Sequence, residues 1–222
     1  MLRRKFWEWP DGLVWKITEK FAVKSRKKKF DLFMSVMKPK PEDKILDVGV
    51  SSSFLCGRGI NFFELWYPHQ DNITALANED KERFANFRES FPKVNLVFGD
   101  GKKLNFPDNK FDIVFSNAVV EHTGELKEQK NFIYEVVRVS KRAFITTPSY
   151  WFPIDTHTLI PFAHWLPQRI RFWIYKKARR GHWADMNRLN LLTPKKFLEC
   201  FPPNVRVKLY RGISLIAIVE KD

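Results

Sequence analysis

The sequence KILDVG, at residues 44–49, decides the fold of this chain. Its apolar run, broken only by Asp47, predicts a short buried strand that leads directly into a glycine turn. An apolar run followed by a glycine and an acid returns in VFGDG, at residues 97–101. A third apolar run, in FDIVFSNAVVEH at residues 111–122, stops at small polar side chains. Ligands bind outside the carboxyl ends of parallel strands, so we expect these three polar tips to line one crevice.

Strands alternate with helical segments through the middle of the chain. We expect strands at residues 45–48, 73–77, 94–98, 111–115 and 143–147, and helices at residues 61–67, 79–90 and 126–139. Thr193 as N-cap and Pro194 in the first turn predict a helix through Cys200. An antiparallel strand pair at 205–210 and 213–219 follows. This order predicts an α/β fold with a doubly wound, mostly parallel seven-stranded sheet that ends in an antiparallel pair.

Two basic segments flank this core. The first is N-terminal and predicts two helices, one with Leu13, Val14, Ile17 and Phe21 on one face and one over residues 30–37, separated by the basic run at residues 26–29. The second is an insertion after the fifth strand, where Leu166, Ile170, Trp173 and Ile174 form a helical apolar stripe among basic residues, ended by Gly181. We therefore divide the chain into an N-terminal helical extension (1–40), an α/β core (41–150), a basic aromatic helical insertion (151–192) and a C-terminal helix and strand pair that completes the sheet (193–222).

The formal net charge of +14 is concentrated in the flanks. Residues 1–40 hold 12 Lys and Arg against 4 Asp and Glu, whereas residues 41–150 hold 14 against 16. A basic flank of this kind favours an anionic surface or an anionic substrate as partner.

The rest of the composition indicates a globular protein of the cytoplasm. Hydrophobic residues make up 44% of the 222, and no apolar run approaches the roughly 18 residues that span a bilayer. The basic N-terminus is interrupted by Glu8, Pro10 and Asp11, which argues against a cleaved signal peptide. Cys56 and Cys200 have no CxxC spacing and fit a reducing compartment. We expect a cytoplasmic protein, with peripheral contact to the cytoplasmic face of a membrane as an option.

The order of motifs resembles one known family. GD at 99–100, LNFPDNKFDIV at 104–114 and EH at 121–122 are similar to the type 11 branch of the class I S-adenosylmethionine-dependent methyltransferases. The resemblance covers residues 41–150 and extends more loosely through TTPSYWFP at 146–153 to Asp155 and His157. It implies a Rossmann-like fold and S-adenosylmethionine as cofactor. The family usually has a second glycine two residues after Gly49, and this chain has Ser51 there.

The resemblance also implies a set of cofactor-binding residues. The turn after the first strand would hold the methionine part, an acid after the second strand the ribose, and the acid after the third strand or its neighbour the adenine amine. Backbone after the fourth strand would line the cofactor. The positions concerned are Asp47, Gly49, Ser51, Glu79, Asp100, Gly101 and Asn117. A plain helix N-terminal acid is an equally open interpretation of Glu79.

The acceptor side is expected at the ends of the fourth and fifth strands. His122 is the first candidate base, with Glu121 beside it, because imidazole titrates near neutrality. Asp155 and His157 form a second candidate set. A packing or capping role is the alternative for either histidine. These four residues could also hold a divalent cation, but the sequence predicts no metal site.

Three functions remain open at this stage. The favoured one is methyl transfer to a small-molecule, glycan or lipid-linked acceptor, with a hydroxyl as target, at an anionic membrane surface that the basic flanks contact. Nucleic-acid methylation also suits the charge, but the proline-rich motif of amino-methylating enzymes is missing after the fourth strand, so nucleic acid is an unlikely partner. A non-catalytic scaffold would agree with the reduced glycine motif.

Overall fold

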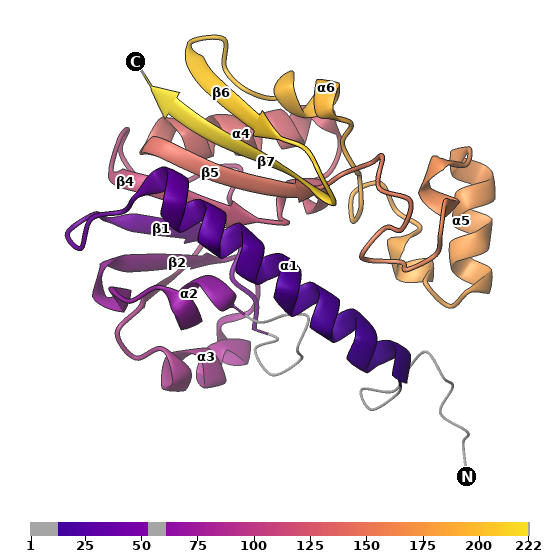
Figure 1. The fold of residues 1–222 in the computed structure, drawn as a ribbon, viewed down its shortest axis with the longest axis horizontal. Coiled ribbons are helices and arrows are strands. Elements are labelled where there is room, and N and C mark those ends of the chain that lie inside the picture. Colours follow the sequence, from indigo (N-terminus) through magenta and orange to yellow (C-terminus); the bar gives the residue numbers. More distant parts are fainter. Residues whose placement is uncertain (1–12, 53–60, 222) are drawn as a thin grey trace.

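The computed structural model describes residues 13–52 and 61–221 (Figure 1). Seven strands form one sheet in the order β3-β2-β1-β4-β5-β7-β6. Their bounds are β1 Ile45–Val48, β2 Ile73–Ala77, β3 Asn95–Phe98, β4 Phe111–Asn117, β5 Ser140–Pro148, β6 Val205–Tyr210 and β7 Ser214–Lys221. The five strands from β3 to β5 pair in parallel, and β7 pairs antiparallel with both β5 and β6. The expected fold class is confirmed.

Helices cover both faces of the sheet, which is why the middle of each central strand is largely apolar. On one face lie α1 Leu13–Met37, α2 Phe62–Trp66 and α3 Ala85–Ser90, whose phenylalanines pack on alternate strand residues such as Ile45 and Phe115. On the other face lie α4 Leu126–Val139 and α6 Pro194–Leu198, which cover Leu46 and Val114. As expected, Thr193 caps α6, because its Oγ1 accepts a hydrogen bond from the Lys196 amide at 3.3 Å.

The expected break between two N-terminal helices was wrong. The basic run at residues 26–29 continues the helix, and α1 is a single helix of 25 residues. Lysine and arginine are good helix formers, and the run contains no glycine or proline that would break it. The proposed apolar face at Leu13, Val14 and Ile17 lies outside the described side chains, while Phe21 is 67% exposed.

The expected helix at 79–90 is also divided. It consists of a 3₁₀ turn at Lys81–Phe84 followed by α3. In the insertion, α5 spans Gln168–Lys177, with Ala178 as its C-cap. It ends earlier than expected because Arg179 takes the left-handed conformation with φ 57°. Gly181 instead begins a 3₁₀ turn at Gly181–Trp183.

The insertion stands apart from the sheet, at the end where the parallel strands point (Figure 1). The N-terminal half of α1 extends beyond the sheet at the same end. The N-terminal half of α1 and the basic insertion therefore lie on the same side of the molecule. Among the described residues, no helix has the length and apolar character needed to cross a bilayer.

Candidate functional site

A cavity of about 440 Å³ opens at the carboxyl ends of the central strands. This size falls within the range of about 300–1,000 Å³ that is typical of small-molecule sites. Its lining comes from the turns after β1, β2, β3 and β4, together with α4 and the insertion: Val48, Gly49, Leu76, Asn78, Gly99, Asp100, Gly101, Lys102, Val119, His122, Thr123, Glu128, Phe132 and Asn187. The crevice expected from the sequence is thus present.

The glycines of the cavity let neighbouring side chains approach the backbone. Gly49 has φ +100°, and its amide donates a hydrogen bond to the Leu76 carbonyl at 2.9 Å. A Cβ at this position would overlap the Val119 side chain. A Cβ at Gly101 would lie 2.7 Å from the Phe132 ring. Glycine is therefore required at both positions by conformation or by close packing.

Asp47 is buried, does not line the cavity and lies against a second acid. Its neighbour is Glu64 of α2, which is fully buried. Burial and the Glu64 charge raise the pKa of Asp47 well above its usual value. Burial raises the pKa of Glu64 to about 7. The two carboxyls form a site that favours a bound proton or a nearby cation.

Two of the expected cofactor residues hold the loop after β1. The Ser51 amide donates to Asn61 Oδ1 at 3.0 Å, and Asn61 donates back to the Ser51 carbonyl at 2.9 Å. Glu79 accepts hydrogen bonds from the Ser52 amide and hydroxyl and pairs with Arg83. The structure places Glu79 away from the cavity lining, whereas Asn78, one residue earlier, is part of it.

Of the remaining expected cofactor residues, some line the cavity and others bind neighbouring side chains instead. Asp100 lines the cavity and accepts a hydrogen bond from the Lys102 amide at 2.9 Å. Asn117 does not line the cavity. Its Oδ1 instead accepts hydrogen bonds from the Lys29 ammonium at 2.9 Å and from the Thr146 hydroxyl at 2.8 Å.

Lys29 is a residue that the sequence analysis missed. It reaches from α1 to the end of β4, and burial lowers the pKa of its ammonium to about 8, although the Glu121 charge opposes this shift. In the sequence it stands within a basic run that looks like a solvated helix face. The contact depends on how α1 crosses the sheet, and no local pattern reveals it.

The acceptor candidates lie together at the other end of the cavity. Glu121 is fully buried, and its Oε2 accepts a hydrogen bond from Thr147 of β5 at 2.9 Å. His122 Nε2 and His157 Nε2 lie 3.9 and 3.8 Å from Glu121 Oε1. The two imidazole rings meet edge to face with centroids 4.7 Å apart. The two candidate sets of the sequence are therefore one cluster.

Each histidine of this cluster is oriented through its other nitrogen. His122 Nδ1 lies 2.6 Å from the Arg188 carbonyl, which can only accept, so in the neutral ring Nδ1 carries the proton and Nε2 the lone pair. His157 Nδ1 lies 3.0 Å from Asp155 Oδ1. Burial opposes the charge on His157, but the Asp155 hydrogen bond and the Glu121 and Asp155 charges outweigh it and raise its pKa. The pKa of Asp155 is lowered to about 2 by these contacts and by hydrogen bonds from Thr158, against burial.

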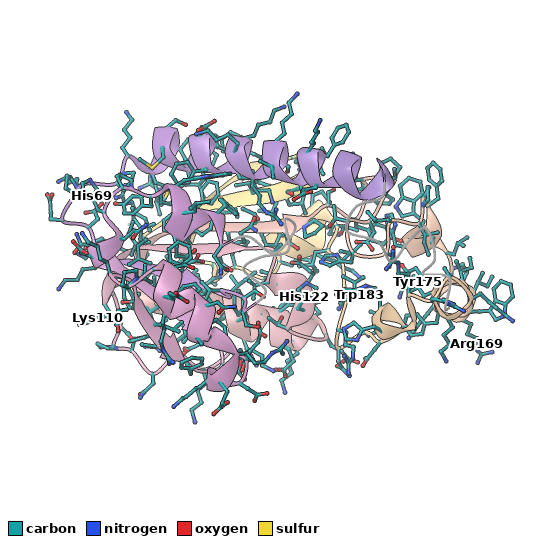
Figure 2. All side chains as sticks on the ribbon, turned by 90° about the horizontal axis from the view of Figure 1, so that it is seen from below. His69, Lys110, His122, Arg169, Tyr175 and Trp183 are labelled. Carbon is teal, nitrogen blue, oxygen red and sulfur yellow. The ribbon has the colours of Figure 1, made fainter. Side chains whose placement is uncertain are left out.

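The insertion completes the cluster from outside. Trp183 packs against both imidazoles, with ring centroids 5.7 Å from His122 and 5.1 Å from His157. Figure 2 shows His122 and Trp183 together where the core meets the insertion, with Tyr175 and Arg169 farther out. Trp183 and Arg188 have no motif of their own and were not expected at the site.

Residues 52–143 match the sequence model of a family described as a methyltransferase domain. This stretch, which is less than half of the chain, is similar to type 11 methyltransferase domains. It is 30% identical over 100 residues to a sterol 24-C-methyltransferase of Aspergillus fumigatus, a match that covers 43% of this chain and 25% of the fungal protein. The chain thus corresponds to about a quarter of the length of that relative.

Solved structures, two of them named as methyltransferases, share this fold. The YcgJ protein of Bacillus subtilis superposes with a TM-score of 0.59 at 14% identity, over 88% of this chain and 99% of that one. A SAM-dependent methyltransferase of Methanosarcina mazei gives 0.52 at 17% identity, over 82% and 94%. An S-adenosylmethionine-dependent methyltransferase of Mesorhizobium loti gives 0.54 at 11% identity, over 81% and 91%.

The methyltransferase domain implies S-adenosylmethionine as cofactor, and the cavity fits such a molecule. The polar groups Asn78 and Asp100 stand at the ends of β2 and β3, where a ribose and an adenine amine need partners. The buried acids Asp47, two residues before Gly49, and Glu64 favour a nearby cation such as an α-ammonium group. The Glu64 carboxyl faces Asp47 and has no nitrogen or hydroxyl donor among the described residues.

Proposed function

We propose that this chain transfers a methyl group from S-adenosylmethionine to a hydroxyl of an amphiphilic acceptor, such as a lipid-linked glycan or another lipid intermediate, at an anionic membrane surface. The observation that supports it most directly is the single cavity that joins Gly49, Asn78 and Asp100 at one end to His122 at the other. S-adenosylmethionine supplies an electrophilic methyl group carried on a sulfonium.

The residues of the domain supply position and proton transfer. In-line displacement gains most of its rate from orientation, so the backbone turns after β1 and β3 have the task of fixing the cofactor. Asn78, Asp100 and the Asp47 carboxyl are the groups we assign to it, with Glu64 supporting Asp47. Gly101, Ser51 and Glu79 shape the turns, and Asn117 fixes the end of β4.

A hydroxyl acceptor needs a group that removes its proton. His122 Nε2 has a free lone pair, lines the cavity and is held in one tautomer by the Arg188 carbonyl. We assign His122 as this base, with Glu121 stabilising the charge that develops on it. His157 and Asp155 hold Glu121 and the ring of His122 in place from the other side.

The insertion supports a membrane-bound acceptor. Its apolar stripe does not pack on the core, because Leu166 is 38%, Ile170 50% and Trp173 61% exposed. Trp151, Phe162 and Trp165 form a second exposed group, in which the ring centroid of Trp165 lies 6.4 Å from that of Trp151 and 5.2 Å from that of Phe162. Exposed aromatic and aliphatic side chains beside basic ones are typical of interfacial helices. The fungal relative is named for its action on a sterol, which is also an apolar substrate.

Vesicle sedimentation tests the membrane part of this proposal. We expect binding to anionic vesicles at low salt, weak binding to neutral ones, and loss at high salt as the charges are screened. The triple variant Arg169→Gln, Lys176→Gln, Lys177→Gln should bind about 100-fold more weakly, since each basic residue at an anionic surface contributes about 1 kcal/mol. Arg171 is left unchanged because it is half-buried and donates to the His164 carbonyl.

The matched control removes three exposed lysines at the opposite end of the sheet, namely Lys40, Lys44 and Lys110. It loses the same charge and should keep wild-type vesicle binding. Equal weakening in both variants would show a general charge effect and contradict docking through α5. S-adenosylmethionine binding, measured by calorimetry, should be unchanged in both.

A further inference from the structure

The cluster of Glu121, His122 and His157 has the geometry of a metal site. One ligand atom from each residue, Glu121 Oε1, His122 Nε2 and His157 Nε2, lies within 4.8 Å of the other two. We propose that these three atoms bind one divalent cation of the zinc type at the acceptor end of the cavity.

The first observation is an acceptor atom that nothing satisfies. Glu121 is fully buried, and its Oε1 has no hydrogen-bond partner among the described residues. A buried carboxylate oxygen without a partner is costly. The Lys29 ammonium donates to Asn117 Oδ1 rather than to Glu121. A cation between Glu121 Oε1 and the two imidazoles would satisfy this atom.

The second observation is that all three side chains are oriented as metal ligands usually are. Metal-binding imidazoles donate their other N–H to a carboxylate or a backbone carbonyl. His157 Nδ1 faces Asp155 Oδ1 and His122 Nδ1 faces the Arg188 carbonyl. Glu121 Oε2 accepts from Thr147, which leaves Oε1 to point at the histidines.

The distances are compatible with a bound ion after a small adjustment. Zinc lies about 2.0–2.2 Å from imidazole nitrogen and carboxylate oxygen, so two ligand atoms are at most about 4.2 Å apart. The Glu121 Oε1 distances of 3.9 and 3.8 Å to His122 and His157 are within this limit. His122 is 33% exposed and can move toward the ion without repacking the core.

The donor set selects the kind of ion. Two imidazoles and one carboxylate suit Zn²⁺, Co²⁺ or Fe²⁺, whereas Mg²⁺ and Ca²⁺ prefer oxygen ligands. Three protein ligands leave positions open on the side where His122 lines the cavity. An acceptor hydroxyl bound there would lose its proton more easily, and His122 would then act as a ligand rather than as the base. This catalytic role rests on the proposed function, whereas binding of the ion does not.

Cobalt(II) titration of the chelator-treated full chain tests the site, with no cofactor or acceptor present. We expect one equivalent of Co²⁺ to produce visible d–d absorption bands that Zn²⁺ removes and Mg²⁺ does not. Glu121→Gln and His157→Gln should weaken binding more than 100-fold, and Asp155→Asn about 10–100-fold as an orienting partner. His182→Gln is the matched control, because His182 is exposed and packs on Trp183 without facing Glu121.

Folding of each variant is checked by circular dichroism and thermal melting. Should Glu121→Gln fail to fold, His122→Gln, at a partly exposed position, replaces it and should also abolish the bands. No bands with Co²⁺ and no heat with Zn²⁺ would overturn the proposal, as would bands that survive both Glu121→Gln and His157→Gln. The cobalt titration contains no S-adenosylmethionine. A failure to find methyl transfer would therefore contradict the proposed function without contradicting the metal site.

Discussion

The two ends of the cavity are built in different ways. The cofactor end consists of short turns that directly follow β1, β2 and β3, and its distinctive positions are glycines or residues next to them. The acceptor end is assembled from side chains of segments distant in sequence. Lys29 comes from α1, Glu121 and His122 follow β4, Asp155 and His157 follow β5, and Trp183 belongs to the insertion.

This difference separates binding from chemistry. A change at the cofactor end should alter backbone packing and therefore affinity for the cofactor. A change at the acceptor end removes a side chain and should alter turnover while the cofactor still binds. The predictions below break or sharpen this division, and they run from the largest expected effect to the smallest.

Gly49→Val should abolish cofactor binding. The backbone at Gly49 is in a conformation that a branched residue does not adopt, and a Cβ would overlap Val119. Strain and overpacking together cost about 2–6 kcal/mol. Calorimetry with S-adenosylmethionine and a thermal melt measure both consequences. Gly212→Ala is the control, since the nearest atom to its Cβ is 3.9 Å away, and it should bind normally.

His122→Ala should slow turnover by about 10²–10⁴-fold, the usual contribution of a positioned base. Its affinity for S-adenosylmethionine should stay close to that of the wild type, because the imidazole belongs to the acceptor end. Single-turnover rates and calorimetry on the same preparation provide the measurement. Turnover equal to that of the wild type would assign His122 to packing and transfer the role to His157.

The cofactor end was largely predictable from sequence, and the acceptor end only in part. Gly49, Asp100 and Gly101 follow apolar runs, so strand periodicity and one glycine place them. Glu79 was expected because the resemblance implies an acid after the second strand, but its carboxylate accepts hydrogen bonds from Ser52 instead. Lys29 reaches Asn117 only because of the way α1 crosses the sheet. Trp183 and Arg188 reach the histidines only because of the path of the insertion. No local sequence pattern encodes either arrangement.

Glu64→Gln should change how stability depends on pH. The pKa of Glu64 is about 7 in the folded chain, above the ordinary value of 4.5, so the folded state holds a proton that the unfolded state releases earlier. The contribution of Glu64 to the free energy of unfolding of the wild type is fully present below pH 4.5. It is lost as the pH rises through about 7. The loss is at most about 3.5 kcal/mol, given about 1.4 kcal/mol per pKa unit.

Urea unfolding at a series of pH values measures this effect. The Gln variant should lack the decline between about pH 4.5 and 7 and should exceed the wild type in stability above it. Glu89→Gln, at an exposed position, should follow the wild-type curve. A decline that persists in the Glu64 variant would show that another group, such as Asp47, holds the proton.

The most direct test of the central claim is methyl transfer itself. The chain would be incubated with S-adenosylmethionine carrying an isotopically labelled methyl group and with a cell extract, and the products would be analysed by mass spectrometry. The account predicts label on a hydroxyl of an amphiphilic molecule in the lipid-soluble fraction, absent with Gly49→Val and strongly reduced with His122→Ala. Label confined to nucleic acid, or no labelled product from a chain that binds S-adenosylmethionine, would contradict it.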